Sequence, residues 1–123
     1  MPIDITRLEP GIYKAHLYGV IQLDEALATQ ADGKRVALEH GDDRYVLIVE
    51  VDRDTDMPFD IRNAGQVIRS NDAEKTYVVG ATLHIRLLLK LLGGLFGFKD
   101  FITCKTLDDA LARARKALAT PAP

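Results

Sequence analysis

The sequence predicts an α/β fold with a mixed, mostly parallel sheet of about five strands and flanking helices. The first observation behind this prediction is the run Tyr45–Val51, in which six of the seven residues are aromatic, β-branched or leucine. Near-continuous apolarity of this kind is typical of a strand buried on both faces in the middle of a sheet. The second observation is the order of the expected elements, two strands and a helix followed by three strand–helix pairs. Repeated pairs with short links imply parallel strands joined by right-handed crossovers.

The amino-terminal part is expected to form an antiparallel hairpin followed by a helix. The two strands and the turn between them are Ile3–Leu8, Ile12–Leu17 and Glu9–Gly11. Gln22–His40 is predicted to be a helix, and acidic residues lie in its first turn, where the helix dipole favours them. Gly33 lowers the helix propensity by about 1 kcal/mol relative to alanine. A hairpin over Arg35–Tyr45 therefore stays open as the alternative.

After the central strand, the chain is expected to alternate between helices and short strands. Pro58 fits the first turn of a helix, where its missing N–H has no partner to lose. Thr106 resembles a helix cap, because two aspartates follow it closely and its hydroxyl can accept from a free N–H group. The expected elements are a helix from about Pro58 to Ile68, a strand at Thr76–Gly80, a helix that opens at Thr82, a strand at Phe98–Cys104 and a last helix through Leu118. The prediction is one domain over residues 1–119 with a flexible tail at 120–123.

Composition argues against several classes of protein. The 123 residues carry a net charge of −2 with interspersed signs, which suits one domain and does not suit a nucleic-acid partner. The start lacks the basic and apolar regions of a signal peptide, and a single cysteine, Cys104, allows no internal disulfide. Both features favour a cytoplasmic protein. The most apolar window, Leu83–Phe98, is shorter than the roughly 20 residues of a transmembrane helix. No glycine-rich phosphate loop is present, and no cofactor is expected.

The acidic turn Asp52–Asp56 suggests two further chemistries, both less favoured than a solvated turn. A metal-dependent phosphatase of the haloacid dehalogenase type would use Asp52 as nucleophile and Asp54 as acid/base, but that family has threonine or valine where this chain has Asp56. A calcium loop of the EF-hand type would need glycine and glutamate at two positions where this chain has neither. The three histidines and Cys104 lack ligand spacing, so no metal site is expected.

Four features in order resemble one family over almost the whole chain. They are the strand pair that leads into Gln22–His40, a strand ending in an acidic residue at Val46–Asp52, a loop and helix over Asp54–Arg69, and a strand with a threonine-led acidic helix start at Phe101–Leu111. The family is that of the STAS domains, named for sulphate transporters and anti-sigma factor antagonists. The resemblance is greatest to small stand-alone bacterial members of unknown role. It implies a mixed sheet in a βα superhelix and a non-catalytic module for regulation through protein–protein interaction.

The resemblance places the partner-binding surface on the loop after the central strand and the start of the next helix. Anti-sigma factor antagonists carry a phosphorylated serine at the start of that helix, whereas Met57–Ile61 holds no serine and has Asp60 near the expected spot. Asp60 is either an ordinary helix-start residue or a fixed negative charge. Acidic clustering is expected to attract a basic patch on another protein. The candidate partner-binding residues are Asp52, Asp54, Thr55, Asp56, Asp60 and Arg62.

The third helix is apolar almost all round, so it cannot bury every side against one sheet. The surplus apolar surface is expected to form a homodimer contact, and a carrier of a lipid or other apolar ligand is the alternative. The expected contact residues are Ile85, Leu88, Leu89, Leu92, Leu95 and Phe96. Arg86 and Lys90 lie one turn apart on this helix. They are either a solvated stripe or a pair that binds an acidic side chain or an anion.

Overall fold

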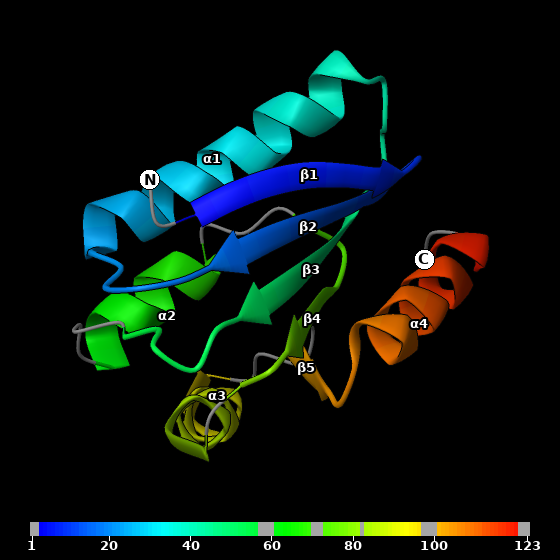
Figure 1. The fold of residues 1–123 in the computed structure, drawn as a ribbon. Coiled ribbons are helices and arrows are strands. Elements are labelled where there is room, and N and C mark those ends of the chain that lie inside the picture. The colour runs from blue at the N-terminus through cyan, green and yellow to red at the C-terminus, as the bar shows by residue number, and fades with distance from the viewer. Residues whose placement is uncertain (1–2, 57–60, 70–72, 82, 97–100, 121–123) are drawn as a thin grey trace.

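The computed structural model describes residues 3–56, 61–69, 73–81, 83–96 and 101–120. Within these residues, five strands form one sheet in the order β1-β2-β3-β4-β5, and four helices cover it (Figure 1). The strands are β1 (Ile3–Glu9), β2 (Ile12–Leu17), β3 (Val46–Val51), β4 (Thr76–Val79) and β5 (Phe101–Cys104). The helices are α1 (Leu23–Glu39), α2 (Ile61–Arg69), α3 (Leu83–Phe96) and α4 (Leu107–Ala119).

The sheet is mixed and mostly parallel, as the sequence predicts. β1 and β2 form the antiparallel hairpin, whose turn uses Gly11 at a φ of +81°, in the left-handed region that favours glycine. β2, β3, β4 and β5 are parallel neighbours. The prediction that the central strand and the strand at Thr76–Gly80 lie side by side in the sheet interior is confirmed, because β3 and β4 pair in parallel and each has a second neighbour.

Two predictions about the helices are confirmed. Gln22–His40 forms helix α1 and not a hairpin, and the Gln22 N–H donates to Glu25 Oε1 at 3.0 Å where the helix begins. The cap of the last helix is also present, because Thr106 Oγ1 accepts a hydrogen bond from the Asp109 N–H at 3.1 Å. The expected element starts within 58–60 and 98–100 lie outside the described residues.

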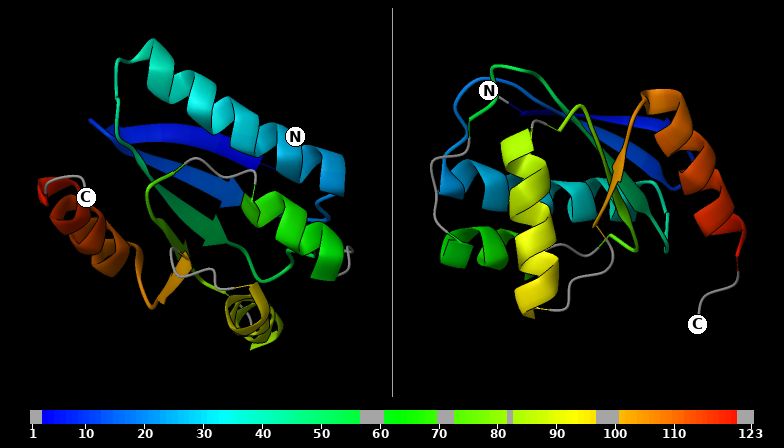
Figure 2. Two further views of the ribbon diagram at one scale, coloured as in Figure 1. Left: turned by 180° about the vertical axis from the view of Figure 1, so that it is seen from behind. Right: turned by 90° about the horizontal axis from the view of Figure 1, so that it is seen from below.

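The two faces of the sheet are covered by different helices (Figure 2). α1, α2 and α3 pack on one face, and α4 alone among the described helices packs on the other, over β3, β4 and β5. Val46 and Ile48 of β3 belong to the core beneath α4, whereas Leu47 and Val51 belong to the cores beneath α1 and α3. β3 is therefore buried on both faces, as its near-continuous apolarity predicts.

Asp42, between α1 and β3, connects three segments at the amino-terminal edge of the parallel strands. Its carboxylate accepts hydrogen bonds from Arg7 Nε in β1 (3.2 Å), from the Gly11 N–H in the hairpin turn (3.1 Å) and from the Tyr13 hydroxyl in β2. Burial raises the pKa of Asp42, but the hydrogen bonds from Tyr13, Arg7 and Gly11 outweigh burial and hold the pKa below its ordinary value. The folded state therefore favours the ionised carboxylate.

We expect Asp42→Asn to lower the free energy of unfolding by about 2–3 kcal/mol at pH 7, because it removes the charge that three donors share. The folded-state pKa lies below the unfolded one, so this contribution is present above the unfolded pKa of about 4 and is lost as the pH falls through the folded pKa. Urea unfolding between pH 7 and pH 2.5 should show the two proteins converge at low pH. Asp43→Asn, at the exposed neighbouring position, is the control and should stay near wild type. A constant difference across the pH range would contradict this role.

Candidate functional site

The carboxyl ends of the four parallel strands meet at one edge of the sheet, which is the usual place for binding residues in α/β folds. The loop that follows β3 is Asp52–Asp56, and the loop that follows β2 contains Gly19 and Val20. An isolated parallel bridge pairs Val20 with Asp56, so the two loops run side by side beyond the strands.

Four hydrogen bonds join these two loops into one unit. The Asp52 N–H and the Thr55 hydroxyl both donate to the Leu17 carbonyl oxygen, each at 3.0 Å. The remaining two bonds run from the Asp56 N–H to the Gly19 oxygen (2.9 Å) and from the Ile21 N–H to the Asp56 oxygen (2.8 Å). Because backbone groups of both loops are engaged, the fold fixes the path of the loop that carries the acidic side chains.

The acidic side chains of the loop differ in the partners that they contact. Asp52 is partly exposed, and its Oδ1 lies 2.8 Å from His16 Nε2 of β2. Asp54 and Asp56 are exposed, and neither has an ion-pair partner among the residues that the structure describes. Arg53 is also exposed on this loop, so its outer part presents two carboxylates and one guanidinium, a net negative charge.

Val20 is a member of this surface that sequence reasoning missed. Its side chain is 53% exposed although it is aliphatic, and it pairs with Asp56 across the two loops. A lone valine after a glycine carries no sequence signal of exposure. Only the meeting of the two loops identifies it as an apolar side chain next to the acidic residues.

The other predicted partner-binding residues differ in their exposure. Thr55 is only 9% exposed, and its hydroxyl is used by Leu17, so it holds the loop and does not face a partner. Asp60 lies outside the described residues. Arg62 is exposed in the first turn of α2.

Helix α3 turns only part of the predicted contact surface outward. Ile85 is 7% exposed and packs with Val51 and Val78, and Leu89 packs against the same cluster, so these two residues face the sheet. This corrects their placement on an outer surface, and the reason is that the sheet is wide enough to bury that side of the helix. The side chains of Leu88, Leu92, Leu95 and Phe96 lie outside the described part. Among the side chains of the helix that the structure describes, the large apolar ones that are exposed are Leu83, Leu87 and Leu91, at 64%, 58% and 45%.

The described residues also bear on two kinds of feature that the sequence analysis considered, a membrane span and a metal site. None of the described helices is both long enough and apolar enough to cross a membrane. In the same residues, no three side chains of His, Cys, Asp and Glu are grouped closely enough to hold a metal ion. The contact between His16 and Asp52 thus involves only two such groups.

The fold defines the class: it is the mixed α/β sheet of the STAS type, with one antiparallel hairpin leading into parallel βα units. The phosphorylated form of the Bacillus cell fate determinant SpoIIAA matches with a TM-score of 0.59 and 14% identity, over 90% of this chain and 97% of that chain. The anti-sigma factor antagonist SpoIIAA in its unphosphorylated form matches with a TM-score of 0.58 and 14% identity, over 92% of this chain and 97% of that chain. No protein-family model and no curated protein sequence matches the chain. The expected STAS-like fold is confirmed.

We expect Thr55→Val to loosen the acidic loop, because it removes the hydroxyl that donates to Leu17 at nearly constant volume. The free energy of unfolding should fall by about 1 kcal/mol, and the amides of Asp52 and Asp56 should exchange faster with deuterium. Thr55→Ser retains the hydroxyl and should lie closer to wild type in both measurements. Unchanged exchange in the valine variant would contradict a loop held from Leu17.

Proposed function

We propose that this chain is a non-catalytic regulatory module that binds another protein through the carboxyl-terminal edge of its sheet. The observation that carries the proposal is the held loop Asp52–Asp56, which exposes the carboxylates of Asp54 and Asp56 and pairs Asp56 with the exposed Val20. An apolar contact with a charged rim is common at protein interfaces. A loop already fixed by the fold also loses little conformational entropy on binding.

The partner expected from this chemistry is a protein with a basic patch. Uncompensated carboxylates on a fixed loop steer such a patch during diffusional encounter, and the effect acts mainly on the association rate. Exposed charges are screened by salt, so binding should weaken strongly as ionic strength rises. Asp52 contributes less than its neighbours, because His16 already lies against its carboxylate.

The structural similarity to SpoIIAA supports a regulatory role for this chain, but it does not support regulation of this chain by phosphorylation. SpoIIAA is named an anti-sigma factor antagonist and is known in phosphorylated and unphosphorylated forms. Residues 57–60 of this chain are Met-Pro-Phe-Asp and contain no hydroxyl side chain, and the Thr55 hydroxyl before them is bonded to Leu17. We infer that binding at this edge does not depend on phosphorylation of that stretch, and that Asp60 supplies a fixed charge there.

The test is a charge reversal at the two exposed carboxylates, Asp54→Lys with Asp56→Lys. Tagged wild-type protein should capture a partner from source-cell lysate, and the double variant should capture at least about tenfold less, because it opposes the basic patch with like charge. The thermal midpoint should be nearly unchanged, since exposed loop substitutions usually alter stability by less than about 0.5 kcal/mol. Captured protein is quantified by mass spectrometry at two salt concentrations.

The matched control is Asp43→Lys compared with Asp54→Lys. Both replace one exposed loop carboxylate, but Asp43 lies at the opposite edge of the sheet. Equal loss in both variants would show an effect of net charge alone and would contradict this surface. Capture that survives the double reversal but is abolished by Arg86→Glu would move the working surface to α3. Magnesium-dependent release of phosphate from a generic ester, abolished by Asp52→Asn, would favour the small phosphatase instead.

The exposed leucines of α3 support a second proposal, self-association. Leu83, Leu87 and Leu91 are spaced four residues apart, so they share one face of the helix. We expect the protein to sediment as a dimer at roughly tens of micromolar, a range in which even a weak dimer is populated. Leu87→Gln with Leu91→Gln should return it to monomer, because both substitutions replace exposed apolar surface with polar groups.

Leu38→Gln is the control for that experiment. Leu38 is 67% exposed on α1, so this substitution removes exposed apolar surface from a different helix. Wild-type protein that is monomeric throughout this concentration range would contradict self-association. A co-purified apolar ligand in native mass spectrometry would instead favour the carrier of a lipid or other apolar molecule.

A further inference from the structure

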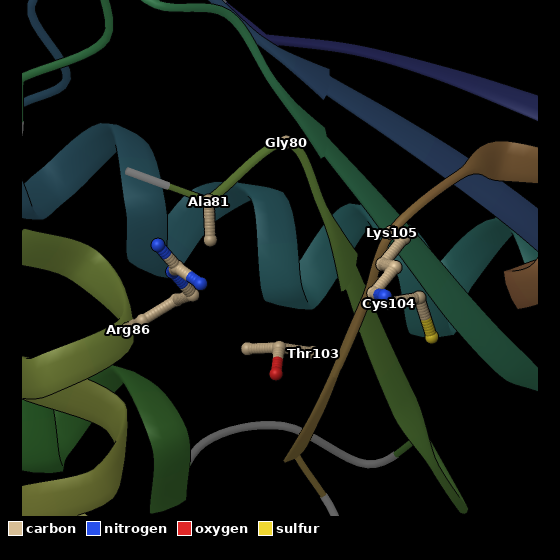
Figure 3. A pocket seen from close by; sticks show the side chains of 6 residues that line it. All are labelled: Gly80, Ala81, Arg86, Thr103, Cys104 and Lys105. Atoms are coloured by element: carbon tan, nitrogen blue, oxygen red, sulfur yellow. The ribbon is translucent and has the colours of Figure 1, made fainter. Parts of the chain in front are cut away.

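A hollow of about 430 Å³ opens where β4 and β5 end, beside the first turns of α3 (Figure 3). Its walls come from three parts of the chain that are distant in sequence: the turn after β4, the helix α3, and the end of β5. The residues that line it are Gly80, Ala81, Arg86, Thr103, Cys104 and Lys105. A volume of this size is in the range of small-molecule sites.

The charge of the hollow is positive. Arg86 extends into it from α3, and Lys105 lies in the opposite wall just after β5 (Figure 3). None of the six lining residues that the structure describes is acidic, and within the same described part of the chain neither cation has an ion-pair partner. Asp109, in the first turn of α4, is already paired with Arg113 at 3.3 Å. Two cations with no acidic side chain between them favour an anion.

Small residues keep the space between the cations open. Gly80 has a φ of +78°, and a Cβ at this position would lie 2.6 Å from the Val51 carbonyl oxygen, so only glycine fits. Ala81 adds only a methyl group to the wall. The turn after β4 therefore packs tightly against β3 and leaves its outer side free of bulky side chains.

Thr103 adds a hydroxyl to the wall of the hollow. In Figure 3 the methyl group of Thr103 points toward Arg86, its hydroxyl points toward neither cation, and the sulfur of Cys104 points away from Arg86. Burial raises the pKa of the Cys104 thiol, which keeps this side chain uncharged. The charged groups that line the hollow are thus a guanidinium and an ammonium, both hydrogen-bond donors.

We propose that this hollow binds a phosphate group, with Arg86 and Lys105 as the two charged ligands. A guanidinium presents a planar fork that matches two phosphate oxygens, and an ammonium supplies a point charge to a third. A carboxylate would leave one of these donors without an acceptor. An apolar ligand would have to cover both charges without compensation. The site lies apart from the acidic loop of the proposed function and does not rest on it.

The two cations that lie one turn apart on α3 differ in their position relative to the hollow. Arg86 lines the hollow, whereas Lys90 is exposed on the same helix and does not line it. Lys90 is therefore a matched control, since its removal changes net charge by the same amount a single turn away.

The experiment is an amide NMR titration of the whole chain at constant ionic strength, with four separate ligands. Inorganic phosphate and glycerol 3-phosphate are the two phosphate sources, and acetate and chloride are the comparison anions. At least one phosphate source should shift the amides of Thr103 and Lys105 saturably. Arg86→Gln and Lys105→Gln should each weaken that binding at least about tenfold, because each removes one charged hydrogen-bond donor. Lys90→Gln should stay within about twofold of wild type.

The four ligands and the variants distinguish the two phosphate sources, and they include outcomes that would contradict the proposal. Tighter binding of the ester indicates that the hollow also contacts the organic part of a metabolite, and equal binding identifies free phosphate as sufficient. Acetate that binds as tightly as both phosphate ligands would overturn the proposal, as would an equal loss in Lys90→Gln. Unsaturated shifts with every ligand would also overturn it. Arg86 and Lys105 are exposed, so both variants should fold, and the wild-type pattern of unaffected amides verifies this. Capture by the acidic loop is scored separately with Asp54→Lys, so one proposal can fail without the other.

Discussion

The position of β3 beside the hairpin depends on the carboxylate of Asp42. A parallel neighbour for β2 requires the chain to return along α1 before β3 begins. The return ends in a local turn, in which Gly41 has a φ of +72° and the Asp42 N–H donates to the Ala37 oxygen at 2.9 Å. Asp42 attaches this turn to the hairpin, because its two oxygens accept hydrogen bonds from β1, from the hairpin turn and from β2 at once. With the start of β3 fixed there, Ile12 pairs with Val46 and the register continues to Leu17 and Val51. The acidic loop that follows Val51 is therefore placed by a carboxylate at the opposite edge of the sheet.

Charged residues have different roles at the two edges of the sheet. At the amino-terminal edge, where Asp43 is exposed, two ion pairs hold segments together. Asp42 binds Arg7, and Arg44 binds Glu74 and also donates to the carbonyl oxygens of Leu118 and Thr120, which attaches the end of α4 to the sheet. Hydrogen bonding to Arg44 holds the pKa of Glu74 below its ordinary value, as expected for a carboxylate in a structural pair. At the carboxyl-terminal edge, exposed charges of both signs lack such partners within the described residues. Paired charges stabilise the frame at one edge, and uncompensated charges remain for binding at the other.

The sequence predicts the frame because the frame is built from local patterns. The apolar run of β3, the helix over Gln22–His40 and the cap at Thr106 each carry their signal within a few residues. The orientation of α3 carries a weaker signal, since a helix that is apolar almost all round has little besides Arg86 and Lys90 to indicate which side faces the solvent. The inward position of Ile85 follows only from its contacts with Val51 and Val78.

The site is less predictable because its members meet only through tertiary structure. Thr55 looks like an available hydroxyl in sequence, yet the adjacent end of β2 offers the Leu17 carbonyl oxygen and buries it. Val20 and the hollow are also defined by tertiary structure: Val20 by the meeting of two loops, and the hollow by the turn after β4, helix α3 and the end of β5. Sequence reasoning can place residues at the end of a strand, but it cannot say which side chains from neighbouring loops share a surface.

The two proposed binding surfaces are neighbours of opposite sign. The acidic loop follows β3, the cationic hollow follows β4 and β5, and the close contact between Gly80 and the Val51 carbonyl oxygen joins the turns that lead to them. A phosphate bound between Arg86 and Lys105 would cancel the positive charge on that side of the edge. A basic partner would then meet less repulsion, and by linkage the partner would raise the affinity for phosphate by the same factor. Such coupling needs no change of conformation, because the potential of the edge alone differs between the empty and the occupied hollow.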